Sequence, residues 1–496
     1  MGKHTGKAAF LTVVSILVWP TIAASQQGGV GAPATGTQYG GISAQTPAPV
    51  TASPSAGQSG ATGGPAPGLQ IDLGIKTTVK RDDNFALTAG GGAGTTGISD
   101  TNLSFGISSV TQAYTLTVNG SGVLRYAHIP GRTLKGFEDP ILNVLFIADS
   151  ANSRLTINGH YRRVERLFLN PFQVLREDLA NNLITNGGIL RDPSYSLKYE
   201  TGLNDPLGFV VNLKHAEKNF SQVTNPRLFD TTTDTLTGQA NLRFNPVTTG
   251  RVTAGYTHYT AKDLVLTDRR TVDYAIGVTR DLTQTLQLDA QIGHTAVKTD
   301  TVTGVVHRDG LTGAVNLVQT VANGTVSGGY SVTRNQNGER QTLSFGRNLM
   351  LPNGSINATF GYTKGSIGKT ALIGSLAYSL QLAADTFSVN IDRAVGTNNS
   401  NQEILDTTFG LSWGHSIDAI SSLNLGVNWA KSDDIGPTNS PTIQLTDLTA
   451  SYSRQMTADW TMTGGMTYRT RTETGKLDAH STAVFLTLGR NFSYRP

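Results

Sequence analysis

Apolar and small polar residues alternate with a period of two from Leu69 to the end of the chain. In the last stretch, one face of an extended strand carries Val484, Leu486, Leu488, Phe492 and Tyr494, and the other carries Ala483, Thr487, Gly489, Asn491 and Ser493. An apolar face with aromatic residues near its terminal end is typical of the strand that closes a transmembrane β-barrel. Phe485 and Arg490 depart from the pattern; an arginine near the membrane edge can still extend its guanidinium to the headgroups.

The same alternation recurs upstream, for example over 285–293, 387–392, 423–430 and 460–469. A tilted strand needs about 9–11 residues to cross the hydrocarbon layer, which fits this length. A row of soluble β-sandwiches would also alternate, but it would turn an apolar face inward and a charged face outward. Here the polar face is mainly Thr, Gly, Asn, Gln and Ser, which suits a water-filled interior. The pattern predicts an all-β protein with a single antiparallel barrel over residues 69–496.

Short turn signals set the expected number of strands. They occur at 111–112, 150–152, 202–206, 246–250, 281–284, 323–324, 351–354, 383–385, 416–418 and 457–459. The later ones recur roughly every 30 to 42 residues, the spacing of two strands and one longer loop. About ten such turns, with both barrel ends on the periplasmic side, predict about 22 strands, and any even number from 16 to 22 is compatible.

The connections on the opposite side are expected to be polar and mostly longer. Examples are Val395–Gln402 and Lys431–Ser440. The longest irregular stretch, Phe168–Gly188, contains Pro171. Long loops inside compact folds usually have a function, so this stretch is the best candidate for a loop that folds into or over the lumen.

Residues 1–25 have the features of a secretory signal peptide. A basic start with Lys3 and Lys7 precedes an apolar run over 8–19, and Ala23–Ser25 offers small residues for cleavage. An uncleaved membrane anchor is the alternative, although the run is short for spanning a bilayer. No later stretch approaches the ~20 apolar residues of a spanning helix. The sequence therefore predicts export.

Residues 26–68 consist mainly of Gly, Ala, Pro, Ser, Thr and Gln. Such a segment buries too little apolar surface to offset its ordering entropy, so it is expected to be a disordered tether. Binding a partner or threading into the pore is the alternative role. Barrels of about 22 strands usually carry a plug, and this segment is too poor in apolar residues to fold as one. Energised uptake by a plugged receptor is therefore not expected.

Composition narrows the function classes. The chain has no cysteine, so disulfides and thiolate metal sites are excluded. Its net charge is +4, and charged residues make up 15% of the chain, below a typical ~25%. The sequence has no cluster of Lys and Arg of the kind that marks a nucleic-acid footprint.

Two short motifs resemble a known family. They are Arg81-Asp82-Asp83-Asn84-Phe85, after the first predicted strand, and the stretch from Val484 to Phe492 with the terminal Arg495-Pro496. With them, the chain from Leu69 onward resembles the beta-barrel porin 2 family of Gram-negative outer-membrane proteins. Members often accompany exopolysaccharide synthesis and export machinery. The resemblance implies an outer-membrane location and a polysaccharide cargo.

The strings that suggest catalysis or metal binding have ordinary explanations. Gly410–Gly414 matches G-x-S-x-G, but it lies within an alternating strand, and Ser412 and His415 point to opposite faces. Asp82-Asp83-Asn84 lacks the spacing of a calcium loop and is expected to form a turn. The histidines show no ligand spacing. We therefore expect no enzyme activity, no metal site and no cofactor.

Charged residues on the polar face are the candidates for lining the lumen. Charge on the lipid face would cost about 2–4 kcal/mol for Arg or Lys at the midplane. These residues could pair across the pore and stiffen it, or form a mixed-charge constriction that selects solutes. The predicted lining residues are Lys198, Glu200, Lys214, Arg243, Asp273, Asp289, Asp392 and Arg469.

The combined prediction is a porin-like outer-membrane channel for hydrophilic solutes. The family resemblance adds a role as the outer-membrane component of exopolysaccharide export. The alternative is a structural or adhesive barrel that presents surface loops. Expected partners are outer-membrane lipid and the barrel-insertion machinery, with polysaccharide or export-machinery proteins implied by the resemblance, and no nucleic acid.

Overall fold

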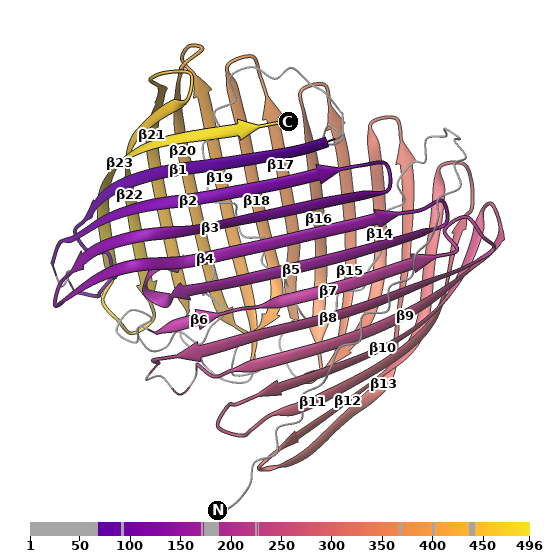
Figure 1. Ribbon diagram of the computed structural model, residues 1–496. Helices are drawn as coiled ribbons and strands as arrows, with labels where there is room; N and C mark the ends of the chain where they lie inside the picture. Colours follow the sequence, from indigo (N-terminus) through magenta and orange to yellow (C-terminus); the bar gives the residue numbers. More distant parts are fainter. Residues whose placement is uncertain are drawn as a thin grey trace, which may run out of the picture. The chain divides into compact units, whose positions relative to one another are not determined.

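The computed structural model describes residues 68–90, 94–169, 172, 188–223, 226, 228–366, 370–398, 402–435 and 442–496. The predicted signal peptide and residues 26–67 of the predicted tether lie outside the described residues. Most described residues belong to antiparallel strands (Figure 1). Among the described residues, no helix is long and apolar enough to cross a membrane.

The first half of the sheet contains β1 (Gly68–Asp82), β2 (Thr96–Val110), β3 (Tyr114–Ile129), β4 (Arg132–Asp149), β5 (Ser153–Glu165), β6 (Ile189–Arg191), β7 (Ser194–Thr201), β8 (Leu207–Ser221), β9 (Thr231–Asn245), β10 (Thr248–Ala261), β11 (Asp268–Asp281) and β12 (Leu286–Thr301). The second half contains β13 (Gly304–Val321), β14 (Gly324–Asn335), β15 (Gly338–Leu351), β16 (Gly354–Gly365), β17 (Thr370–Gln381), β18 (Asp385–Thr397), β19 (Glu403–Ser416), β20 (Ser421–Asp434), β21 (Ile443–Gln455), β22 (Trp460–Glu473) and β23 (Ala479–Tyr494). A short 3-10 helix, η1 (Arg166–Phe168), follows β5.

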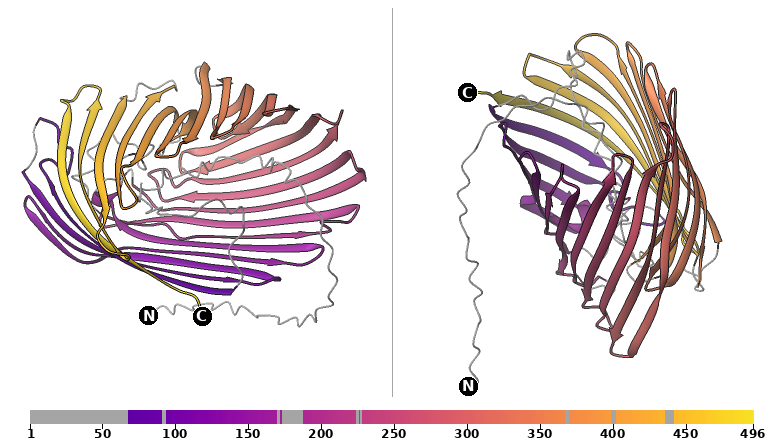
Figure 2. Two further views of the ribbon diagram at one scale, coloured as in Figure 1. Left: turned by 90° about the horizontal axis from the view of Figure 1, so that it is seen from above. Right: turned by 90° about the vertical axis from the view of Figure 1, so that its right-hand side faces the viewer.

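The sheet closes on itself because β1 pairs with both β2 and β23. Figure 1 shows β23 running beside β1, and Figure 2 shows the strands arranged as a ring. The short β6 and the longer β7 both lie between β5 and β8, so they share one place in the wall, interrupted at Asp192 and Pro193. The barrel therefore has 22 strand positions, which confirms the predicted number.

The short turns predicted from the sequence all lie at one end of the barrel. The strands that they join are connected at 111–113, 150–152, 202–206, 246–247, 282–285, 322–323, 352–353, 382–384, 417–420 and 456–459. Gly68 and Tyr494 lie at the same end, because β1 and β23 pair antiparallel. Strand β1 begins one residue before the expected Leu69.

The prediction of longer connections at the opposite end is wrong in part. The connections at 130–131, 302–303 and 336–337 have two residues each. Strand β18 extends to Thr397 and β20 to Asp434, so the first three residues of the loop predicted at Val395–Gln402, and the first four of that at Lys431–Ser440, are strand. The polar residues at the ends of β18 and β20 continue the hydrogen-bonded ladder. A polar sequence alone therefore does not distinguish a loop from the end of a strand.

Residues paired in register share a face of the sheet, so the two faces can be followed around the ring. One face carries small polar side chains. The other carries large exposed apolar side chains, among them Leu73, Val79, Phe105, Tyr126, Ile276, Ile292, Phe345, Phe360 and Leu486. A closed sheet with a continuous apolar outer face is suited to contact with lipid acyl chains.

The segment after β5 shows that the polar face is the inner one. Phe168 packs against Ile98 and Ala127, which lie on the polar faces of β2 and β3. Phe172, four residues later, packs against the polar faces of β20 and β21. These strands lie on either side of the β1–β23 seam, and two side chains only four residues apart can contact the polar faces of both sets from the enclosed side alone.

The closing strand follows the prediction. Phe492 and Tyr494 lie on the outer face, paired with Leu73 and Ile71 of β1. Arg490 is also outward, and its Nη2 lies 3.0 Å from Oδ2 of Asp459 in the β21–β22 turn. This location at the rim explains how an arginine is tolerated on the apolar face.

Candidate functional site: the lumen wall

A short apolar segment narrows the lumen at the end opposite the short turns. The centroid of the Phe168 ring lies 3.6 Å from Cζ of Arg125 and 5.5 Å from the centroid of the Phe85 ring. Arg125 is in turn paired with Asp100 at 2.6 Å. The aromatic ring is thus held between a fixed guanidinium and a second ring, which gives this part of the wall a defined position.

Phe172 contacts a second apolar cluster, formed by Ala430, Ile443 and Leu445 of β20 and β21. Strand β21 is the fourth from β2 around the ring, through β1, β23 and β22. Four residues span at most about 14 Å when fully extended. Phe168 and Phe172 therefore both lie on the enclosed side of the sheet, against strands on either side of the β1–β23 seam. The prediction that Phe168–Gly188 folds into the lumen is confirmed for its beginning, while residues 170–171 and 173–187 lie outside the described residues.

The end of the β18–β19 hairpin bends inward as well. By alternation, Glu403 and Leu405 continue the outward face of β19. They nevertheless contact inward residues of other strands: Glu403 Oε1 lies 2.6 Å from Nη2 of Arg340, and Leu405 packs with Ala371. Strand β18 leaves β17 after Arg393, which gives the hairpin the freedom to bend. The side chain of Phe168 and the end of the β18–β19 hairpin thus both lie inside the lumen at this end.

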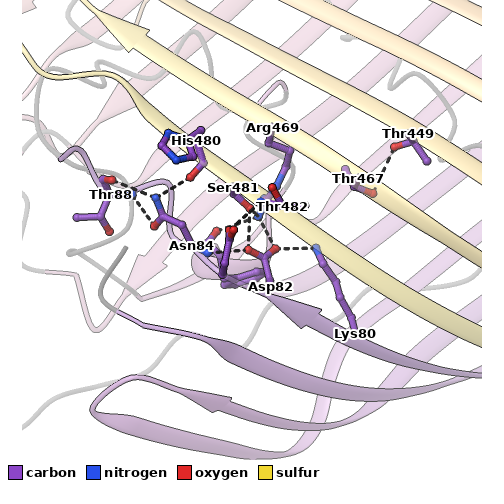
Figure 3. A network of polar contacts seen from close by, with 12 residues as sticks. Lys80, Asp82, Asn84, Thr88, Thr449, Thr467, Arg469, His480, Ser481 and Thr482 are labelled. Atoms are coloured by element: carbon purple, nitrogen blue, oxygen red, sulfur yellow. Dashed lines mark hydrogen bonds and ion pairs between the residues drawn. The ribbon is translucent and has the colours of Figure 1, made fainter. Parts of the chain in front are cut away.

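The end of β1 forms the most connected polar cluster of the inner face, which we call the closure cluster: Lys80, Asp82, Asn84, Arg469 and Ser481 (Figure 3). The Asp82 carboxylate is fully buried. It accepts hydrogen bonds from Ser481 Oγ at 2.7 Å, Arg469 Nη2 at 2.7 Å and the Asn84 backbone N–H at 3.1 Å, and Lys80 Nζ lies 3.1 Å away. The cluster joins β1 to β22 and β23.

Asp83 and Asn84 extend this connection between the first and last strands. The backbone N–H of Thr482 donates to Oδ1 of Asp83 at 2.7 Å, and Asn84 Nδ2 donates to the carbonyl of His480 at 2.9 Å (Figure 3). Asn84 also accepts from the backbone N–H of Thr88 at 3.0 Å, which shapes the turn. The motif therefore forms the expected turn. Among the described residues, no group of three His, Cys, Asp or Glu could hold a metal ion.

All eight predicted lining residues lie on the inner face by register, but most are engaged with neighbours. Lys198 Nζ lies 3.0 Å from Oε1 of Glu200. Asp289 Oδ1 accepts from Arg251 Nη2 at 2.7 Å. Arg243 Nη1 donates to carbonyls of the β7–β8 turn, including that of Gly202 at 2.9 Å. These pairs stiffen the wall.

The remaining candidates differ in their surroundings. Arg469 belongs to the closure cluster and lies 5.6 Å from the ring of Phe85. Asp392 faces inward between Ser375 and Thr408. Asp273 faces inward beside Gly255 and Thr295.

Lys214 is exposed on the inner face of β8, and it forms no hydrogen bond or ion pair with a described residue. Of the eight candidates, it is the one whose charge is most clearly available to a solute.

Sequence reasoning missed Arg251 and Asp82. Both side chains face inward. Arg251 is in register with the inward Asn241 and Gly277, and Asp82 with the inward Ala483. Their role depends on partners far away in the sequence, such as Asp289 and Arg469, which no local pattern reveals.

The serine of the G-x-S-x-G string has no catalytic surroundings. Ser412 Oγ faces the lumen and lies 2.7 Å from Ser388 Oγ. His415 lies on the outer face, where its Nδ1 is 2.9 Å from Oδ1 of Asp385. The two side chains are on opposite sides of the sheet, as the sequence predicts.

No protein-family model matches the chain, and no curated protein matches it. Solved structures match over most of the barrel. A ferric enterobactin receptor (PfeA) variant of Pseudomonas aeruginosa in complex with enterobactin has a TM-score of 0.53 and 10% identity, covering 86% of this chain and 82% of that one. The apoprotein form of the FrpB iron transporter of Neisseria meningitidis has a TM-score of 0.56 and 8% identity, with coverages of 85% and 81%.

At such low identity, these similarities define the fold and nothing finer. The protein is a closed 22-strand antiparallel barrel of the outer-membrane type, with the cell outer membrane as its location. The apolar outer face supports the same location independently. The resemblance to the beta-barrel porin 2 family remains a prediction.

Proposed function

We propose that the protein is an outer-membrane channel for hydrophilic solutes. The observation that carries the proposal is the chemistry of the enclosed face. Hydroxyl pairs lie along it, with oxygen–oxygen distances of 2.7 Å for Thr359 and Ser375 and 2.8 Å for Ser453 and Thr463. Hydroxyls both donate and accept, so they can exchange these partners for water or for solute hydroxyls.

Charged side chains are also present on this wall. The pairs Lys198–Glu200 and Arg251–Asp289 compensate each other's charge, and Lys214 and Asp273 add one charge of each sign. The buried apolar clusters that involve Phe168 and Phe172 lie on the inner face at the end opposite the short turns. This arrangement favours passage of polar solutes, with selection at the narrow end.

A polymeric cargo is the finer part of the proposal. It rests on the resemblance of the two terminal motifs to a family that often accompanies exopolysaccharide export. A wall rich in hydroxyl and amide groups is compatible with a polyhydroxylated chain, because it offers many equivalent weak contacts along the path.

The test is conductance of the purified full chain in planar bilayers. We expect discrete conductance steps, because the proposed water-filled lumen would carry ions. Protein that inserts as a folded barrel but produces no steps at any voltage would contradict the channel and favour a structural or adhesive barrel. Circular dichroism of the same sample verifies the β-content.

A further inference from the structure

Lys214 lies in a pocket of the lumen wall that the channel proposal does not by itself explain. The pocket has a volume of about 290 Å³ and is lined by residues of β3, β4, β5, β7 and β8, most of which face inward. This is about the lower limit of volume for small-molecule sites. None of its described lining residues is an Asp or Glu. The ammonium group of Lys214 therefore gives the pocket a positive charge.

The neighbouring side chains are oriented by bonds among themselves. His160 Nδ1 lies 2.7 Å from Oδ1 of Asn143, which fixes the orientation of the Asn143 amide. Asn158 Nδ2 donates to Ser196 Oγ at 3.3 Å. These bonds leave the Asn143 amide nitrogen and the Ser196 hydroxyl proton for other partners, so the pocket offers directed donors beside a cation.

A second pocket continues the first along the wall. It has a volume of about 530 Å³, shares Asn119 and Asn143 with the first pocket, and extends to Asn491 and Asp72 on β23 and β1. Three asparagines and three serines supply its neutral polar groups, and the one charged lining residue described, Asp72, is negative. A ligand that spans both pockets would thus meet a positive charge at one end and neutral or negative groups at the other.

We infer that this part of the wall is a binding site for a hydroxylated carboxylic acid, such as a sugar acid, with its carboxylate at Lys214. An ammonium group and oriented N–H and O–H donors suit a carboxylate, since charge-assisted hydrogen bonds are about twice as strong as neutral ones. The amides of Asn119 and Asn143 each donate and accept, which matches neighbouring hydroxyls. Asp72 disfavours a second carboxylate at the far end. The inference rests on the proposed function, because the solute must enter the lumen.

The test uses glucuronate and glucose as probes of the purified full chain in planar bilayers. We expect glucuronate to block the ion current saturably and glucose to block it about tenfold more weakly, as for the loss of one charge-assisted contact. Lys214→Gln should reduce the block by glucuronate to the level of glucose. Lys76→Gln is the matched control, because Lys76 is an exposed lysine on the inner face of β1 outside both pockets.

If Lys214→Gln and Lys76→Gln weaken the block by glucuronate equally, the proposed site is wrong and the effect reflects the general charge of the lumen. Equal block by glucuronate and glucose in the wild type would also overturn it, while leaving the channel proposal intact. Absence of any conductance would contradict the channel itself. Calorimetric titration of the detergent-solubilised barrel with glucuronate then tests the pocket separately, and no binding there would overturn it.

Discussion

The inner wall contains two polar regions of opposite character. In the closure cluster, the buried carboxylate of Asp82 has four polar partners, and Arg469 is covered by Phe85. At the pocket on β8, Lys214 is exposed and unpaired among the described residues. Alternation places all of these side chains inside. The number of neighbouring polar groups then determines whether an inward charged side chain stabilises the wall or remains available to a solute.

The largest effect is expected from breaking the closure cluster. Asp82→Ala leaves Lys80 and Arg469 facing each other without their carboxylate, which for a buried pair costs about 3–5 kcal/mol. We expect the free energy of unfolding, measured by urea titration in detergent, to fall by about this amount.

Asp72→Ala is the control for this variant, since Asp72 lies on the same face of β1 in a less buried position, where it accepts hydrogen bonds from the neutral groups Ser493 Oγ at 2.6 Å and Gln70 Nε2 at 2.9 Å. It should cost about 1 kcal/mol or less. Equal losses in the two variants would contradict the distinction between a buried carboxylate with charged partners and a less buried one with neutral partners.

Truncating the aromatic side chain at the narrow end comes next. Phe168→Ala should raise the unitary conductance, because the ring occupies the lumen between Arg125 and Phe85. Since Phe168 is only half-buried, stability should fall by less than the ~3–5 kcal/mol of a fully buried phenylalanine. The measurement is single-channel recording combined with urea titration.

Phe360→Ala removes the same atoms from the outer face and should leave the conductance unchanged. An identical conductance in wild type and Phe168→Ala would mean that this segment does not limit the path.

The ion selectivity should respond more to the exposed region than to the saturated one. Lys214→Gln and Asp273→Asn are expected to shift the reversal potential in opposite directions under a salt gradient, because they remove charges of opposite sign. Arg469→Gln should shift it less, since that guanidinium is mostly buried beneath Phe85. A larger shift for Arg469→Gln than for Lys214→Gln would reverse our assignment.

The smallest effect is expected at the serine of the G-x-S-x-G string. Ser412→Ala removes one hydrogen bond to Ser388, worth about 0.5–1.5 kcal/mol, and should leave the conductance unchanged. Ester hydrolysis by the purified protein that disappears in Ser412→Ala would contradict this prediction.

The sequence predicts the barrel well because its signals are local. Period-two alternation defines both faces of β23, and turn residues mark all the connections at the end that contains Gly68. The interruption at Asp192 and Pro193 was not foreseen, although proline removes a donor from the ladder and is often found at such irregularities. The closure cluster was not foreseen either, because Asp82 and Ser481 meet only when the barrel closes.

The central claim is that successive side chains of each strand face, in turn, the enclosed water and the surrounding lipid. Single cysteine substitutions at two neighbouring positions of one strand test this claim most directly. The chain has no cysteine of its own, so each substitution provides a unique thiol. Thr408 faces inward beside Asp392, and Phe409 faces outward beside Ile391. In liposomes, a charged, membrane-impermeant thiol reagent should label Thr408→Cys and leave Phe409→Cys unlabelled. Labelling of Phe409→Cys alone, or of both positions equally, would contradict the account.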